Sequence, residues 1–332
     1  MAYTAGDTIS NSDYNGLLNN TASGTPNAGV AARGINYIAG TGAGEYGLGQ
    51  TELGSVGTAD TITAAQWNSL FTFMDNIANH TNISALTSTT AAAAGDVIAI
   101  KAALETDLTA LASAVAGGST DADALETSAA LQTVTTASEG WDSTATQEVS
   151  ITFGSANKMR WFFNAGGKVR ITVGIVTTTE QPKDVSFKDL GTALGNLDIG
   201  AHSLNRSGTG ETSTTYAEQS GGFYDLTGPA DTYVSLIKLT SDNTNYTSNT
   251  IEIFAKIDAA IGTAVTMTIK MVATDDASDA QYTAGNTDGV AAEIKDTPKM
   301  VTTLFTITPT FLQGLSDPTY GITSAEVSNT TT

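Results

Sequence analysis

The chain has 332 residues, enough for two or three compact domains, and it contains no cysteine, which excludes disulfides, thiolate nucleophiles and cysteine-ligated metals. Its 34 acidic and 14 basic side chains give a formal charge of −20, so we do not expect it to bind a nucleic-acid backbone. The first residues have neither the basic region nor the apolar region of a signal peptide, so we do not expect one. No apolar stretch approaches the length of a transmembrane helix, so we do not expect membrane insertion either.

Nearly the same 11-residue motif occurs twice in the first 70 residues, as "DTISNSDYNGL" at 7–17 and "DTITAAQWNSL" at 60–70. Each copy predicts a helix start with a capping box and a hydrophobic staple. The residues concerned are Ile9, Ser10, Asp13 and Tyr14 in the first copy, and Ile62, Thr63, Gln66 and Trp67 in the second. We expect helices ending near Asn20 and His80. The two starts would pack together or equivalently against neighbouring subunits, unless the similarity is a coincidence among Asn- and Thr-rich caps.

A glycine-rich stretch, "NYIAGTGAGEYGLGQTELGSVGTAD", separates the two copies. Gly42, Gly44 and Gly47 spell G-x-G-x-x-G, but no helix-forming sequence follows, so we interpret them as a loop and not as a dinucleotide site. The stretch has little periodic apolar content and predicts an extended arm. We therefore expect the isolated protein to be an oligomer, or to have a disordered N-terminal third until it assembles.

An Ala- and Thr-rich segment follows at 85–140 and predicts a helix with a near-heptad apolar seam. The seam consists of Val97, Ile100, Leu104, Leu108, Leu111 and Val115. Gly117 and Gly118 are natural helix stops, and a weaker helical stretch is expected through Leu131.

After Gly140 the sequence alternates apolar and polar residues in Val-, Ile- and Thr-rich runs, which predicts strands with one buried face. The expected fold is α+β and mainly β, with an antiparallel β-sandwich at 141–312 and one small helix near "FKDLGTAL". It is preceded by the helix-and-arm region at 1–84 and the helical segment at 85–140. The stretch 313–332 is expected to be an extended tail or a strand added to a neighbour.

The densest apolar feature, "NKMRWFFNAGGKVRITV" at 157–173, predicts a core hairpin. Because side chains alternate along a strand, Trp161 or Phe163 should be buried and Phe162 should point the other way. The alternative is that Phe162 meets another subunit.

No motif for catalysis or for a cofactor occurs in the chain. The two histidines, His80 and His202, lack the spacing of a metal site. The acidic loop at 275–288 offers oxygen ligands for Ca²⁺ from Asp275, Asp276, Asp279 and Asp288, but without EF-hand spacing, so a solvated loop is the favoured interpretation. We expect neither an enzyme nor a cofactor.

Four segments together carry a resemblance: "MAYTAGDTISNSDYNGLLN", "EYGLGQ", "DTITAAQWNSLFTFMDNIANH" and "SITFGSANKMRWFFNAGGKVRIT". With looser matches at "GGFYDLTG" and "YTSNTIEIFAKI", they resemble uncharacterised virion structural proteins of tailed bacteriophages, especially marine and cyanobacterial phages with T4-like particles. The helical insert near 85–130 departs from that pattern.

The resemblance implies a virion structural protein assembled in the host cytoplasm, with a tail or neck appendage such as a fibre as the leading expectation. Its partners would be copies of itself, with a trimer as the first guess, and other virion proteins. The alternatives are a capsid decoration or tail-tube subunit, or a module that recognises host-surface glycan through an exposed aromatic platform. For that platform the candidates are Tyr216, Phe223, Tyr224, Tyr233 and Tyr246.

Overall fold

The computed structural model divides the chain into two compact units, and each unit is built from three separate stretches of sequence. The helical unit comprises Met1–Glu126, Ala156–Gly167 and Thr308–Tyr320, and the β unit comprises Thr127–Ser155, Lys168–Ile307 and Gly321–Thr332. The structure describes residues 10–20, 32–84, 86–87, 91, 93, 101–118, 120, 124–136, 141, 143–176, 182–210, 213–216, 221–226, 232–242, 246–275, 299–311 and 314–332.

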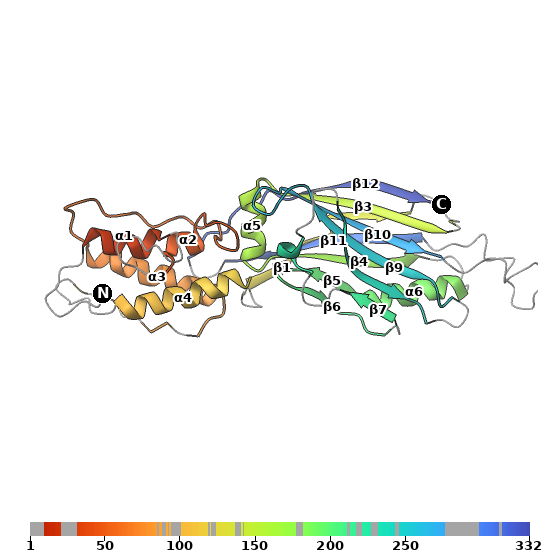
Figure 1. Cartoon of the computed structure of the whole chain (residues 1–332), viewed down its shortest axis with the longest axis horizontal. Coiled ribbons are helices and arrows are strands. Elements are labelled where there is room, and N and C mark those ends of the chain that lie inside the picture. The colour runs from red at the N-terminus through yellow and green to blue at the C-terminus, as the bar shows by residue number, and fades with distance from the viewer. Residues whose placement is uncertain are drawn as a thin grey trace, which may run out of the picture. The chain divides into compact units, whose positions relative to one another are not determined.

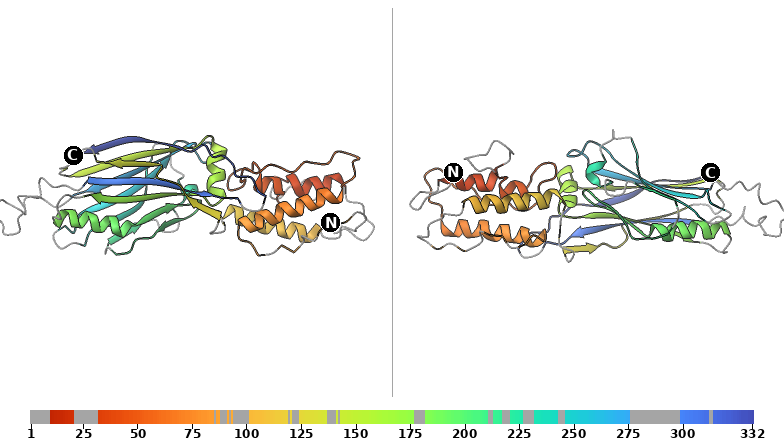
Figure 2. Two further views of the ribbon diagram at one scale, coloured as in Figure 1. Left: turned by 180° about the vertical axis from the view of Figure 1, so that it is seen from behind. Right: turned by 60° about the horizontal axis from the view of Figure 1, so that its bottom comes forward.

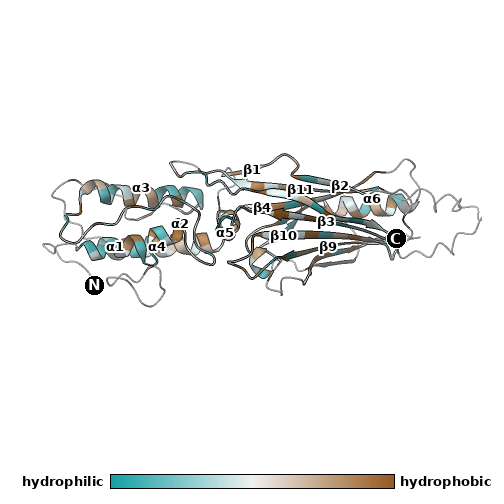
Figure 3. Cartoon of the chain, turned by 90° about the horizontal axis from the view of Figure 1, so that it is seen from above, coloured by the Kyte–Doolittle hydropathy of each residue, from teal (hydrophilic) through white to brown (hydrophobic). Residues whose placement is uncertain are grey.

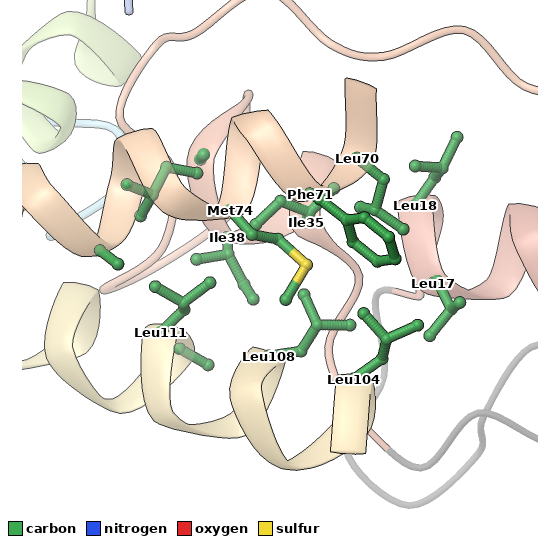
Figure 4. Packing of buried hydrophobic residues seen from close by; sticks show 14 of the residues in the cluster. Leu17, Leu18, Ile35, Ile38, Leu70, Phe71, Met74, Leu104, Leu108 and Leu111 are labelled. Carbon is green, nitrogen blue, oxygen red and sulfur yellow. The ribbon is translucent and has the colours of Figure 1, made fainter. Parts of the chain in front are cut away.

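Four of the helices in the helical unit pack around one apolar core. The helices are α1 (Asn11–Asn19), α2 (Ile35–Ala39), α3 (Ala64–His80), α4 (Lys101–Ala116) and α5 (Ala156–Asn164). The first four each point leucine, isoleucine, methionine or phenylalanine side chains into a shared cluster, as Figure 4 shows for Leu17, Ile38, Met74 and Leu108. Burial of this apolar surface is the main force that holds the short helices together.

The predicted helices at 10–20 and 64–80 are confirmed. The seam of α4 is confirmed from Leu104 to Val115, while Val97 and Ile100 lie outside the described residues. The helix ends at Ala116, before Gly118 with a φ of 61°, as the two glycines predicted. The arm contains one helix that the sequence did not predict, α2.

The prediction of a weak helical stretch through Leu131 was wrong, because the residues around Leu131 form strands. β1 (Leu125–Thr127) and β2 (Gln132–Thr135) both lie along β11 (Lys299–Pro309). The Leu131 N–H donates to the Leu304 carbonyl at 2.8 Å. The pairing with a distant strand therefore overrides the local helix propensity of the residues before Leu131.

The β unit contains two antiparallel sheets stacked as a sandwich, which confirms the predicted α+β class (Figures 1 and 2). In sheet A the order is β1-β11-β4-β5-β6, with β2 also on β11; the further strands are β4 (Lys168–Val176), β5 (Asn196–Ile199) and β6 (Leu204–Arg206). In sheet B the order is β12-β3-β10-β9-β8-β7, formed by β12 (Thr323–Thr331), β3 (Thr144–Thr152), β10 (Thr266–Thr274), β9 (Thr250–Ile257), β8 (Val234–Thr240) and β7 (Ser213–Tyr216).

Strict alternation along the central strands fixes which face of each sheet is buried. Every second residue of β3 and β10 is buried, and Figure 3 shows the hydropathy changing along the strands accordingly. The predicted small helix is α6 (Pro182–Leu194), whose Phe187 and Leu190 are buried. Trp141 meets Phe187 edge to face with ring centroids 5.1 Å apart. A 3₁₀ turn at Phe223–Asp225 precedes β8.

One buried position of β3 is polar. Gln147 donates to the Met300 carbonyl at 3.0 Å and accepts from the Thr302 hydroxyl at 2.5 Å. These bonds tie sheet B to sheet A through the core, and they satisfy an amide that would otherwise be costly to bury.

The last strand corrects the expectation of a tail or of a strand given to a neighbour. β12 pairs antiparallel with β3 of its own chain, and the Ser324 hydroxyl donates to the Leu131 carbonyl at 2.8 Å. The sequence has few large apolar residues here, which is typical of an edge strand and explains why the pattern was missed.

The boundaries expected at 84, 140 and 312 also differ from the two units. Both α5 and the segment 308–320 belong to the helical unit, although strands of the β unit flank them in sequence.

None of the helices in the described part of the chain combines the length and the apolar composition needed to cross a membrane.

Candidate functional site

The repeated helix starts form the capping boxes that their spacing predicts. At α1, the Asp13 N–H donates to the Ser10 hydroxyl at 3.2 Å, and the Ser10 N–H donates to the Asp13 carboxylate at 3.3 Å. At α3, the corresponding bonds between Thr63 and Gln66 measure 3.3 and 2.8 Å. Each box satisfies two backbone N–H groups that an α-helix leaves without partners.

The two copies also pack on each other, as one of the two sequence interpretations proposed. Tyr14 and Trp67 occupy the same position in their copies, and their rings meet edge to face at 5.5 Å. The Tyr14 hydroxyl donates to the Gln66 carbonyl at 3.1 Å, and burial raises the pKa of Tyr14 above its usual range. Ile62 is half-buried against the same apolar cluster, whereas Ile9 lies outside the described residues. The repeat therefore builds the joint between α1 and α3.

The glycine-rich arm is held by carboxamide side chains that the sequence analysis missed. Asn15 donates to the Val56 carbonyl and accepts from the Val56 N–H, both at 2.8 Å. Asn36 makes the same pair of bonds to Leu53, both at 2.9 Å. Each amide thus takes the place of a neighbouring strand for one residue of the arm. No sequence signal separates these two from the many other asparagines.

A third carboxamide joins the arm to the segment 308–320. Gln50 donates to the Ser316 carbonyl at 2.7 Å and accepts from the Ser316 N–H at 2.8 Å. The partners are far apart in sequence, so spacing alone could not reveal the contact. Together these three carboxamide contacts fix the path of the arm, although the arm has no periodic apolar pattern.

The aromatic run expected in a hairpin lies in the helix α5, and only the strand after Gly167 is as predicted. Phe162 and Phe163 are both fully buried, with ring centroids 5.1 Å apart, while Trp161 is half-buried. The expected opposite orientation of Phe162 and Phe163 was wrong, because successive helical residues are about 100° apart and not 180°. Phe162 also meets Tyr320 at 5.4 Å within the helical unit.

α5 also hydrogen-bonds to the glycine-rich loop through the side chains of Arg160 and Trp161. The buried guanidinium of Arg160 donates to the carbonyls of Gly44 at 2.8 Å and Tyr46 at 3.0 Å, and more weakly to those of Thr41 and Gly42, both at 3.3 Å. The Trp161 indole N–H adds a 3.0 Å bond to Thr41. We call this arrangement the Arg160 clasp.

The clasp explains the G-x-G-x-x-G pattern. Gly42, Gly44 and Gly47 have φ angles of 43°, 58° and 94°, in the left-handed region that favours glycine. The turns aim carbonyl oxygens at Arg160, whereas a dinucleotide loop aims N–H groups at phosphate. The geometry therefore suits a cation, and Arg160 supplies it.

The two histidines belong to different units, His80 to the helical unit and His202 to the β unit. The His80 ring is buried, stacks on Phe311 at 4.4 Å and lies 3.1 Å from the Ala165 carbonyl through Nε2. His202 stacks on Tyr224 at 4.9 Å. Within the described ranges, no three His, Asp or Glu side chains gather as metal ligands. Of the four aspartates considered as Ca²⁺ ligands in the acidic loop, Asp275 is described and buried, and the other three lie outside the described residues.

The solvent-facing side of sheet B carries a cluster of aromatic and basic residues, which we call the cationic patch: Tyr233, Phe254, Lys256 and Lys270. The Nζ atoms of Lys256 and Lys270 lie 4.6 and 4.1 Å from the Tyr233 ring centroid. The Lys270 Nζ is also 4.8 Å from the Phe254 ring, and the two rings are 6.3 Å apart. Burial raises the pKa of Tyr233 to about 12, and the nearby Glu148 carboxylate adds to the rise.

Of the aromatic residues considered for a glycan platform, Phe223 and Tyr246 are buried and cannot serve. Tyr224 and Tyr233 are half-buried, and the side chain of Tyr216 lies outside the described part. Tyr233 has the ammonium groups of Lys256 and Lys270 over its ring.

No protein-family model matches the chain, and no match was found among curated proteins or among solved structures.

Proposed function

We propose that the chain is a structural, non-enzymatic subunit of a tailed-phage virion, in a tail or neck appendage that forms by self-association. A homotrimer is the first arrangement to test. The helical unit would attach the subunit to the particle and to its copies, and the β unit would form the outer part.

One observation carries this proposal: the segments that bear the resemblance to phage virion proteins contact one another. Tyr14 of the first segment meets Trp67 of the third at 5.5 Å. Arg160 of the fourth segment donates to the Tyr46 carbonyl of the second at 3.0 Å. Four stretches scattered over 172 positions thus supply both the α1–α3 joint and the Arg160 clasp. A shared structural framework accounts for this pattern without any reaction.

Quantitative mass spectrometry of purified particles tests the proposal. We expect the chain in the particle at the low copy number of an appendage, and light scattering of the isolated protein should give an oligomer. A high copy number would favour the capsid-decoration or tail-tube alternative. Presence in infected cells but absence from purified particles would refute a virion function altogether.

A second candidate function is recognition of a host-surface glycan by the β unit. The cationic patch favours it, because two aromatic rings and two ammonium groups share one solvent-facing area of sheet B. An appendage subunit can have both functions, since the patch belongs to the β unit and the α1–α3 joint and the clasp belong to the helical unit. Binding of the purified full chain to immobilised polysaccharides tests this candidate directly.

A further inference from the structure

The strand register brings the two lysines of the cationic patch together. In the antiparallel pair β9–β10, Lys256 lies opposite Thr268 and Lys270 lies opposite Phe254. The intervening residues Ala255 and Ile269 are buried, so Lys256 and Lys270 share the outer face as diagonal neighbours. Tyr233, just before β8, places its ring within reach of both ammonium groups.

Neither ammonium of the patch has a carboxylate at ion-pairing distance within the described part of the chain. A third lysine on the same face differs in this respect, because Lys238 pairs with Glu252 at 3.7 Å. Glu148 lies opposite Lys270 on β3, but no ion pair forms between them in the described structure. The chain as a whole repels polyanions, because it has 34 acidic and 14 basic residues, so an anion is attracted only where ammonium groups locally outnumber carboxylates. The patch therefore has two ammonium groups over the Tyr233 ring and one nearby carboxylate, that of Glu148, so one positive charge remains that an anion would neutralise.

The neighbouring rings add a second requirement. Tyr233 and Phe254 are half-buried on the solvent-facing side of the sheet, so each still exposes part of an apolar ring. A ligand that matches both features has an apolar ring face and an anionic group, and lies along a sheet surface. A saccharide bearing carboxylate or sulfate groups has that chemistry, and Lys can bind either group as a point charge.

We infer that Tyr233, Phe254, Lys256 and Lys270 form a binding site for an anionic saccharide on the outer face of sheet B. The inference rests on the second candidate function, glycan recognition, and adds the ligand class and the residues. The two ammonium groups bind the acidic substituent, and the rings pack against the sugar. Lys238 belongs to the same face but not to the site, because Glu252 already neutralises it.

The full chain is tested against three polymers by affinity electrophoresis: heparin as a sulfated chain, polygalacturonate as a carboxylated chain and dextran as a neutral one. We expect binding to at least one anionic polymer and none to dextran. Lys256→Gln and Lys270→Gln should each weaken binding by about fivefold to tenfold, as expected for the loss of one charge-assisted contact. Tyr233→Ala should weaken it as well, while Tyr233→Phe should preserve the ring and most of the affinity.

Lys238→Gln is the matched control, since it removes the same charge from the same face. We expect less than about a twofold change from it. Equal losses for Lys238→Gln and Lys256→Gln would show non-specific attraction and overturn the site. Equal binding of dextran would overturn the anionic ligand but leave glycan recognition standing. Binding to none of the three polymers would overturn the inference, and the virion proposal would be unaffected. Thermal melts of each variant confirm that the fold is retained.

Discussion

Replacing Arg160 by methionine should release the glycine-rich loop from α5. Methionine keeps an unbranched apolar stem of similar reach but donates no hydrogen bond, so the carbonyls of Gly44 and Tyr46 lose their 2.8 and 3.0 Å bonds. A hydrogen bond to a charged group is worth about 1.5–3 kcal/mol. Counting only these two bonds, we expect the free energy of unfolding of the helical unit to fall by about 3–6 kcal/mol.

Fluorescence can follow this unit separately. The chain has three tryptophans; Trp67 and Trp161 belong to the helical unit and Trp141 to the β unit. In a Trp141→Phe background the signal reports the helical unit alone. The midpoint should fall by roughly 10 °C, given about 2–4 °C per kcal/mol for a domain of 150–250 residues. Cleavage at Glu45 by a glutamate-specific protease should become faster at the same time.

Arg160→Lys is the control for charge. A single ammonium cannot bond all the carbonyls that the planar guanidinium reaches, so we expect roughly half the loss of the methionine variant. If Arg160→Met melted like the unmodified protein and Glu45 stayed resistant to cleavage, the loop would not depend on the clasp, and our account of it would be wrong.

Three further predictions concern the caps, the ring contact and a tyrosine. Thr63→Ala should cost about 1 kcal/mol in urea unfolding, because it removes the α3 cap; an unchanged midpoint would contradict this. A double-mutant cycle on Tyr14 and Trp67 should give a coupling of about 0.5–1.5 kcal/mol, and zero coupling would refute a specific ring contact. The pKa of Tyr233, raised from 10 to about 12, favours the neutral form in the fold, so stability should fall as the pH rises from 10 towards 12. Tyr233→Phe should flatten that part of the Tm profile, and an unaltered slope would count against it.

The parts of the fold that local sequence determines could be predicted. The capping boxes at Ser10 and Thr63 involve residues three apart, so their spacing is visible in the sequence. The central strands of the sandwich alternate strictly, and the period of two assigns them without knowledge of their partners.

The parts that depend on distant partners could not be predicted. α5 contains Trp161, Phe162 and Phe163, whose bulky rings favour a strand locally, but the helix places Arg160 against a loop more than a hundred residues earlier in the sequence. The carboxamide of Gln50 pairs with Ser316, and nothing around either residue indicates this. β12 is rich in Thr, Ser and Asn, so its pairing with β3 replaces an apolar pattern as the determinant of its structure.

The interleaving of the two units has a consequence for synthesis on the ribosome. The chain passes from one unit to the other at 126/127, 155/156, 167/168, 307/308 and 320/321. The helices made first cannot obtain Arg160 until α5 has emerged, and Gln50 must wait for Ser316, which is 266 positions later. This protein therefore cannot follow the usual order, in which an N-terminal domain is complete before the next one is translated. Nascent chains stalled before residue 308 should hold an unfinished helical unit beside a largely translated sandwich, and a simple truncation would deliver neither unit intact.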